Sequence, residues 1–320
     1  MKARVSLGLI FICLLSFIVA LQAGSISFSF NQLISALLGQ EGIARTIVYD
    51  LRLPRALAAF VCGGMLALAG TLMQALLRNP LADPYILGVS GGAASAALIA
   101  ILLGFSSLMI QISSFAGALL SILLVFFLAH SHGSWTSSRL LLTGVVLAAG
   151  WNALISFLLS VSPGQQVHSL LFWLMGDLSN THLSLWQVLL LVFMTLVSFA
   201  LARPLNLITR GELQAAALGL NIKSFRILIF FIASGMTAVA ISLAGSIGFI
   251  GLMAPHILRL IIGSDHRILV PLSVLLGGCL LLLADTLART VLAPIQLPVG
   301  VLTAMLGVPL FLALLYKKQK

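Results

Sequence analysis

The sequence predicts an all-α, polytopic membrane protein with about ten transmembrane helices. Of its 320 residues, 61% are hydrophobic and only 8% are charged, whereas a soluble globular domain carries about 25% charged residues. Uncharged stretches such as 84–138 and 140–176 exceed the ~20 residues that cross a hydrocarbon core of ~30 Å. Because these stretches are continuously apolar rather than alternating, they argue against a transmembrane β-barrel.

Gly, Pro and polar residues divide the apolar stretches into single spans. The stretch 84–138 is too long for one helix, and the residues Gly104 to Ser107 form the expected turn within it. The stretch 227–258 divides at Ala244 to Gly248 for the same reason. We expect spans at 5–23, 54–78, 85–104, 109–130, 139–160, 184–203, 224–244, 245–262, 270–290 and 297–316. Residues 1–320 then form a single membrane domain.

The basic residues are distributed as such a bundle requires. With ten spans and both termini cytoplasmic, 13 of the 17 Lys and Arg residues lie inside, and Arg45, Arg52, Arg55 and Arg289 lie outside. This distribution follows the positive-inside rule. The net charge of +10 therefore reflects topology and not nucleic-acid binding, because no soluble folded face is expected. An alternative is that the amino-terminal basic and apolar residues form a cleaved signal peptide, which would leave nine spans.

Three arginines interrupt the apolar pattern at the outer ends of spans. Arg52 and Arg55 flank Pro54, which suits the first turn of a helix, so both should lie at the mouth of the second span. Arg289 follows Asp285 by four residues, a spacing that permits an ion pair within one helix. Their position on the disfavoured side of the membrane indicates a binding role, with snorkelling into the headgroups as the alternative for Arg52 and Arg55.

Two features lie on the predicted cytoplasmic side. The turn at Asn79-Pro80 precedes a run of small residues that allows close helix packing, and irregular backbone at membrane depth is also tolerated beside a pathway. In the loop 204–223, the Ala-rich run between Gly211 and Gly219 predicts short helices. Such helices are either plain connectors or a surface that seats in a partner's groove.

No catalytic motif accompanies these features. The sequence has no GxxxxGK[ST] loop, no HExxH pair and no CxxC pair. We find no catalytic triad, paired catalytic carboxylates or cofactor fingerprint. We therefore expect no catalytic residue, no metal site and no cofactor bound directly by this chain.

Seven stretches, taken together, resemble the FecCD-type permease subunits of bacterial ABC importers, which take up iron-siderophores, haem or cobalamin. They are LRLPRALAAFVCGGMLALAGTLMQALLRNPLADPYILGVSGGA (51–93), SSRLLLTGV (137–145), LLFWLMGDLS (170–179), RGELQAAALGLN (210–221), GSIGFIGLMAPHILRLIIGSDHR (245–267), LLLADTLART (281–290) and LPVGVLTAMLGVPLF (297–311). The first span and the spans at 109–130 and 184–203 match by hydropathy alone.

The resemblance implies an assembly in the bacterial plasma (inner) membrane. The permease would pair with a second copy of itself, as a homodimer, or with a close paralogue. ATP-binding cassette ATPase subunits would bind on the cytoplasmic side, and a periplasmic or lipid-anchored substrate-binding protein would bind outside. ATP would be hydrolysed by the partner chains, so this chain would be a transport subunit and not an enzyme. A short helix at 164–176 would lie by the outer mouth.

The resemblance also implies roles for single residues. Those implied to meet acidic residues of the binding protein are Arg52, Arg55 and Arg289. Those implied to couple to the ATPase, within the coupling segment 204–223, are Gly211, Glu212, Ala215, Ala216 and Gly219. Those implied to lie near the cytoplasmic gate are Asn79, Leu81, Thr136 and Ser137. Many relatives have Glu where this chain has Gln296, so no salt bridge is assumed at that point.

We therefore expect an ATP-driven importer permease for a metal chelate, with iron-siderophore as the first choice of cargo and cobalamin or haem as alternatives. An ion-coupled secondary transporter is a rival reading, but it would need intramembrane carboxylates, and Asp285 is the one acid expected within a span. A structural subunit without a transport path is the third reading. Neither rival requires docking surfaces on both faces of the membrane.

Overall fold

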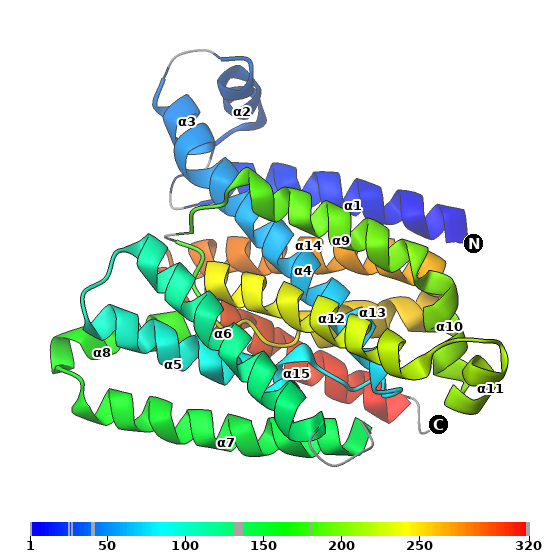
Figure 1. The fold of residues 1–320 in the computed structure, drawn as a ribbon. Coiled ribbons are helices and arrows are strands. Elements are labelled where there is room, and N and C mark those ends of the chain that lie inside the picture. Colours follow the sequence, from blue (N-terminus) through cyan, green and yellow to red (C-terminus); the bar gives the residue numbers. More distant parts are fainter. Residues whose placement is uncertain are drawn as a thin grey trace.

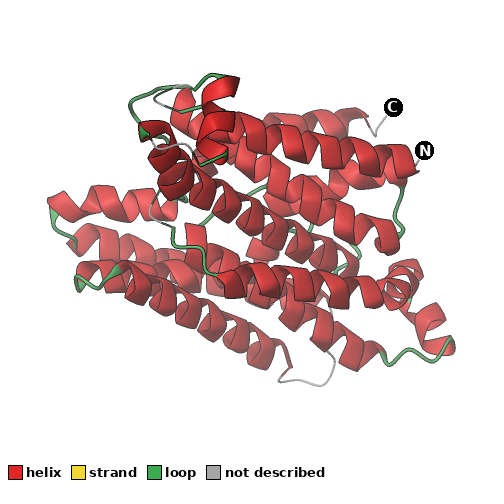
Figure 2. Cartoon of the chain, turned by 90° about the horizontal axis from the view of Figure 1, so that it is seen from above, coloured by secondary structure: helices red, strands yellow, loops and turns green. Residues whose placement is uncertain are grey.

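A computed structural model describes residues 2–317 apart from 25, 27, 40, 41, 131–136 and 180. Over these residues the chain consists of helices and connecting loops, with no strand (Figure 2). The helices run side by side in a bundle, and both termini lie at one end of it, beside α10 and α11 (Figure 1). The short helices α2 and α3 stand out from the opposite end. We call these the inner and outer ends.

Six helical segments of the described chain are long and apolar enough to cross a membrane. Their principal helices are α1 (Lys2–Gln22), α4 (Leu53–Leu76), α6 (Ser107–His130), α7 (Ser137–Val161), α12 (Ile222–Ala244) and α14 (His266–Thr290). A seventh candidate is the pair α9 (Leu185–Ala200) and α10 (Ala202–Arg210), bent by 56°. The shorter apolar helices are α5 (Val89–Leu102), α13 (Ile250–Ile262) and α15 (Val299–Lys317). The remaining helices are α2 (Phe30–Leu37), α3 (Ile43–Thr46), the π-helix η1 (Ile47–Arg52), the 3₁₀ helix η2 (Pro84–Leu87), α8 (Gly164–Leu174) and α11 (Glu212–Ala217).

The prediction of an all-α, polytopic membrane protein is confirmed. Each of the ten predicted spans overlaps one of these apolar helices or the bent pair. The number of ten crossings stays a prediction, because α5, α13 and the described part of α15 are shorter than the other candidates. The helix α8 coincides with the short helix expected at 164–176.

Two predicted spans are too long at their amino-terminal ends. Helix α5 begins at Val89 rather than at residue 85, and α13 begins at Ile250 rather than at residue 245. The segments before them, the 3₁₀ helix η2 and the irregular residues 245–249, meet inside the bundle, where the backbone N–H of Ile247 donates to the Tyr85 hydroxyl at 3.0 Å. Non-helical backbone at membrane depth needs such internal partners, because lipid offers none.

Helices α4 and α14 form the centre of the bundle. A Cβ atom on Gly63 would lie 2.3 Å from the carbonyl oxygen of Gly277, and one on Gly277 would lie 2.6 Å from the carbonyl oxygen of Gly63. Small residues at this crossing therefore allow the two backbones to touch. By contrast, only 6% of the most apolar part of α7 is buried, against 89% for the segment that contains α4. Helix α7 thus lies at the periphery with its apolar side chains uncovered.

Candidate functional site

Asp285 is the centre of an ion-pair cluster at the outer end. The carboxylate of Asp285 is fully buried on α14. Arg55, in the first turn of α4, donates from Nη2 to Asp285 Oδ1 at 2.9 Å and from Nε to both carboxylate oxygens. Arg289 Nε lies 3.2 Å from Asp285 Oδ2. The outer cluster, which we define as Arg55, Asp285 and Arg289, joins α4 to α14 at their outer ends.

Arg52 is turned inward rather than toward the headgroups. Its guanidinium donates to the backbone carbonyls of Leu21 at 2.7 Å and Gln22 at 2.8 Å, and also to that of Ile26. It lies 4.6 Å from the centre of the Phe28 ring. The carbonyls at the end of a helix lack intrahelical partners and carry partial negative charge. Arg52 therefore caps the carboxyl end of α1. The alternative that its side chain snorkels into the lipid headgroups is wrong.

The three predicted docking arginines share one outer cavity. Arg52, Arg55 and Arg289 line a cavity of about 310 Å³, together with residues of the segment that follows α1 and of η1. The carboxylate of Asp285 pairs with two of these three guanidinium groups, those of Arg55 and Arg289, so the cationic charges outnumber the anionic one. Because charges in a low-dielectric setting are poorly screened, the cavity has a net positive charge at this end of the bundle.

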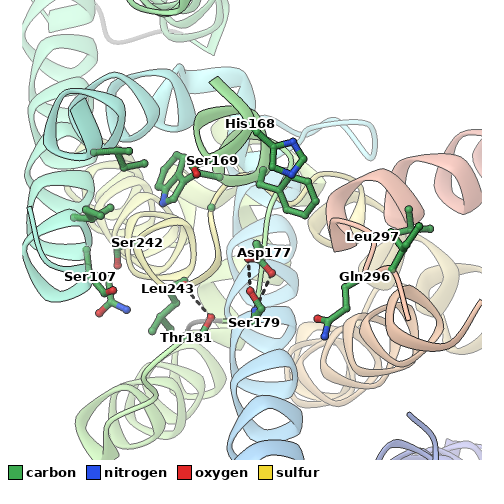
Figure 3. A pocket seen from close by; sticks show the side chains of 17 residues that line it. Ser107, His168, Ser169, Asp177, Ser179, Thr181, Ser242, Leu243, Gln296 and Leu297 are labelled. Carbon is green, nitrogen blue, oxygen red and sulfur yellow. Dashed lines mark hydrogen bonds between the residues drawn. The ribbon is translucent and has the colours of Figure 1, made fainter. Parts of the chain in front are cut away.

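A second and larger cavity adjoins the first. It encloses about 720 Å³, and both cavities are lined by Ser179 and Gln296. Figure 3 shows His168 and Ser169 on one side of it and Gln296 and Leu297 on the other, with Asp177 and Ser179 joined by hydrogen bonds between them. Hydroxyl, amide and aromatic side chains thus border its walls. The two cavities together form one hollow at the outer end, with both polar and apolar walls.

Gln296 has a defined partner in this hollow. Arg55 donates from Nη1 to Gln296 Oε1 at 2.8 Å. The amide oxygen therefore accepts a hydrogen bond from arginine without adding negative charge. Gln296 thus binds Arg55 without the negative charge that a glutamate at this position would bring to the cavity.

A second acid-centred cluster lies at the inner end. Glu212, the first residue of α11, pairs with Arg78 at 3.2 Å and with Arg226 at 3.3 Å. The Glu212 side chain is 32% exposed and that of Arg78 is 44% exposed. The inner cluster, which we define as Arg78, Glu212 and Arg226, ties α11 to the end of α4 and to the start of α12.

Glycine shapes the turns on both sides of α11. Gly211 has φ +151° and Gly219 has φ +86°, backbone conformations that other residues rarely adopt. After α11, the N–H of Gly219 donates to the carbonyl of Ala216 and that of Leu220 to the carbonyl of Ala215, which closes the helix. The sequence correctly placed a short helix between these glycines.

The predicted coupling residues do not all face outward. Ala215 is fully buried against the bundle, while Ala216 and Gly219 are exposed. Two strongly exposed apolar side chains of this segment were not predicted from the sequence: Leu213 is 89% exposed and Leu218 is 69% exposed. The spacing of these two leucines, five residues apart, is typical of no single helix face and so does not predict a contact surface. Large apolar residues in a predicted cytoplasmic loop could, however, have indicated one.

Two of the four predicted gate residues, Asn79 and Leu81, lie in the turn that follows α4. Arg78 has φ +50°, and the Asn79 side chain accepts a hydrogen bond from the N–H of Leu81 at 2.9 Å. The Leu81 side chain is 40% exposed. Thr136 lies outside the described residues, and Ser137 is the first residue of α7. A salt bridge from Arg78 to Glu212 links this turn to the coupling segment.

Comparisons with known proteins agree with this geometry. The FecCD transport family model matches residues 12–317. The hemin transport system permease protein HmuU of Yersinia pestis is 39% identical, over 100% of this chain and 97% of that protein. The vitamin B12 import system permease protein BtuC of Escherichia coli O9:H4 is 41% identical, over 85% of this chain and 84% of that protein.

A solved structure has the same architecture. It is assigned as a metal-chelate type ABC transporter in an inward-facing conformation, is 31% identical to this chain, covers 98% of it and superposes with a TM-score of 0.88. Family, relatives and fold thus lead to one conclusion. The chain belongs to the FecCD transport family and is the permease subunit, not an enzyme, of an ABC importer of the metal-chelate type.

Proposed function

We propose that this permease imports an iron-siderophore, delivered by a substrate-binding protein and driven by partner ATPases, with cobalamin or haem as the alternative cargo. The observation that carries the proposal is the presence of two unlike surfaces at opposite ends of one chain. The outer end has a positively charged cavity, and the inner end has a short helical segment with uncovered leucines. A permease that binds both a substrate-binding protein and an ATPase needs both surfaces.

The outer cavity is the proposed docking site for acidic side chains of the binding protein. All three arginines already have partners within the chain, so docking does not rely on free guanidinium groups. It relies instead on the net positive field of the cavity, which speeds encounter and fixes orientation. The chelate would then enter the adjoining larger cavity, whose walls are both polar and apolar.

The coupling segment 204–223 is the proposed contact with the ATPase. Leu213 and Leu218 would seat in an apolar groove of the partner, while Gly211 and Gly219 set the turns that present α11. Glu212 holds α11 against Arg78 and Arg226, so a push on α11 reaches the turn that carries Asn79 and Leu81. That turn, with Thr136 and Ser137, is the proposed cytoplasmic gate.

We place the chain in the bacterial inner membrane as a homodimer or as a pair with a close paralogue, with both termini cytoplasmic. The position of both termini at the same end as α10 and α11 supports the topology (Figure 1). The uncovered apolar surface of α7 supports a second permease copy beside it. This chain would hold no cofactor, and ATP would be bound by the ATPase.

Reconstitution tests the proposal directly. Liposomes that contain the permease and its ATPase would be given ATP inside and the binding protein outside, loaded in turn with ferric siderophore, cobalamin or haem. We expect ATP-dependent uptake of the ferric siderophore, and no uptake by the permease alone. Uptake that persists without the ATPase and collapses with an uncoupler would instead identify a secondary transporter, and preferred uptake of cobalamin or haem would reassign the cargo.

The ATPase contact has its own test. Leu213→Glu should strongly weaken binding of the ATPase, because it places a charge in the proposed apolar contact, whereas Leu213→Met should leave binding intact. Binding is measured by co-purification in detergent and by stimulation of ATP hydrolysis. Equal binding by both variants would remove Leu213 from the interface.

A further inference from the structure

The inner end contains a third polar cluster, which the proposed function does not use. Asn206 lies in the middle of α10, within the coupling segment, between the bend from α9 and the turn at Gly211. Leu205 and Ile208 are buried and hold α10 against the bundle. The Asn206 side chain points to the turn between α13 and α14, where Asp265 and His266 begin α14.

The Asn206 amide is used as both donor and acceptor. Its Nδ2 donates to Asp265 Oδ1 at 2.8 Å. Its Oδ1 accepts from the backbone N–H of His266 at 2.9 Å and lies 2.7 Å from His266 Nδ1. Because this oxygen can only accept, His266 Nδ1 carries the hydrogen. An amide fits this place, whereas a carboxylate would have no hydrogen to give to Asp265.

These contacts make Asn206 part of the cap of α14. Asp265 accepts from the N–H of Arg267 and is the N-cap residue, and Asn206 accepts from the N–H of His266. The first N–H groups of a helix have no intrahelical partner, so such caps fix where and how the helix starts. The amino end of α14 is thus attached by a side chain to α10.

Helix α14 connects this cap to the outer cluster without interruption. From Asp265 to Asp285 a helix rises about 30 Å. Along this length, the crossing of Gly277 with Gly63 leaves no room between α14 and α4, so the two helices are held as a pair. At its outer end α14 carries Asp285, which binds Arg55 and Arg289, and Arg289 in turn lines the outer cavity.

We propose that Asn206 is a positioning residue for transport, through which movement of the coupling segment is passed to α14 and so to the outer cavity. The inner cluster is a parallel link to α4 and α12, but its ion pairs are partly exposed and therefore weak. His266 is fully buried and Asn206 is half-buried, so the contact between these two residues is shielded from solvent, whereas Asp265 is partly exposed. The inference rests on the proposed function, since it needs the ATPase to move α10 and α11.

The test compares charge-matched variants of the permease bound to its ATPase in lipid nanodiscs. Asn206→Asp places two carboxylates together and should break the link. Asn206→Asp combined with Asp265→Asn exchanges amide and carboxylate, keeps the total charge and should restore the link. Ser184→Ala removes the cap of α9, outside both cavities and the coupling segment, and controls for a general loss of stability.

The readout is hydrogen exchange of the outer residues 286–297, with and without a non-hydrolysable ATP analogue. We expect the analogue to change exchange there at least twofold in the wild type, in the exchanged pair and in Ser184→Ala, and to have no effect in Asn206→Asp. Uptake per ATP hydrolysed should fall at least tenfold in Asn206→Asp alone. A merely structural cap would lower stability but would not remove the response to nucleotide.

The outcomes separate the two claims. If wild-type liposomes show no ATP-driven uptake, the proposed function itself fails. If the wild type transports but Asn206→Asp keeps the nucleotide response, or if the exchanged pair fails to regain it while folding normally, the role of Asn206 is overturned. Should Asn206→Asp not fold, Asn206→Ala replaces it, and an unchanged nucleotide response in that variant overturns the role equally.

Discussion

The two ends of the bundle each pair one acid with two arginines, but in opposite surroundings. In the outer cluster Asp285 is fully buried and the arginine side chains are 8% and 11% exposed. In the inner cluster Glu212 is 32% exposed and Arg78 is 44% exposed, and only Arg226, at 10%, is as buried as the outer arginines. The chemistry is the same, and the degree of burial differs.

This difference in burial indicates that the outer end is rigid and that the inner end moves more easily. Buried charges that lose a partner are left unpaired in a medium of low dielectric, so the outer cluster holds α4 and α14 together strongly. Exposed ion pairs are solvated in either state and break at little cost. A permease that is driven by an ATPase at its inner end needs such an arrangement. Its coupling segment must move, while its outer mouth keeps its shape.

The largest effect should follow from removing the buried acid. Asp285→Ala leaves Arg55 and Arg289 without their shared partner and should destabilise the protein by about 3–5 kcal/mol. The measurement is the fraction of folded permease in detergent after heating, followed by size exclusion. Asp50→Ala removes an exposed acid at the same end and should change stability by less than about 0.5 kcal/mol. Equal midpoints for both variants would refute the assigned role of the outer cluster.

The next effect concerns the charge of the outer cavity. Association of the binding protein should slow about tenfold when ionic strength rises from about 50 to 500 mM, because salt screens electrostatic steering. Gln296→Glu cancels one positive charge beside Arg55 and should flatten this dependence, as measured by surface plasmon resonance. Arg45→Gln, outside the residues that line the cavity, serves as the control. If the association rate of the wild type does not depend on salt, the outer cavity has no electrostatic role in docking.

A smaller effect should appear at the cap of α14. Hydrogen bonds from Asn206 and from the N–H of Arg267 lower the pKa of Asp265. The stabilisation by this carboxylate is therefore complete above its ordinary pKa of about 3.9 and is lost as the pH falls through the lowered folded value.

Asp265→Ala should accordingly cost about 1 kcal/mol at pH 7, as expected for a lost N-cap. The difference in thermal midpoint between wild type and variant should shrink as the pH falls below about 4. Asp265→Asn keeps a capping side chain and should retain most of the stability at pH 7. A difference that is the same at pH 7 and pH 3 would show that the charge of Asp265 plays no part.

The smallest effect on stability should come from the inner cluster. Glu212→Gln should cost less than about 1 kcal/mol, because both ion pairs of Glu212 are partly exposed. The thermal midpoint should depend on salt less in the variant than in the wild type. A loss as large as that of Asp285→Ala would mean that the contrast between the two ends is false.

Much of the fold could be predicted from hydropathy and punctuation. The positions of the apolar helices follow from their uncharged stretches, and the helix between Gly211 and Gly219 follows from helix formers bounded by glycine. The Asp285–Arg289 pair follows from i,i+4 spacing alone. The late starts of α5 and α13 could not be predicted, because apolar residues in irregular backbone have the same hydropathy as those in a helix.

The sequence predicted where the residues of the candidate site lie, but not which residues they contact. Sequence placed Arg52, Arg55 and Arg289 at one end of the bundle, and the structure gathers them around one cavity. That Arg52 caps α1 and that Arg55 binds an acid 230 positions away depends on which helices are neighbours. Hydropathy carries no such information when a helix is apolar on all sides.

The sequence by itself determined that this is a membrane protein, since uncharged stretches of this length are stable as helices in lipid. It also determined which end carries most of the basic residues. Only the tertiary structure decided which polar groups meet: Arg55 with Asp285, Glu212 with Arg78, and Asn206 with the start of α14. The physical reason is that burial and pairing set the strength of each contact, and both arise from the packing of distant helices.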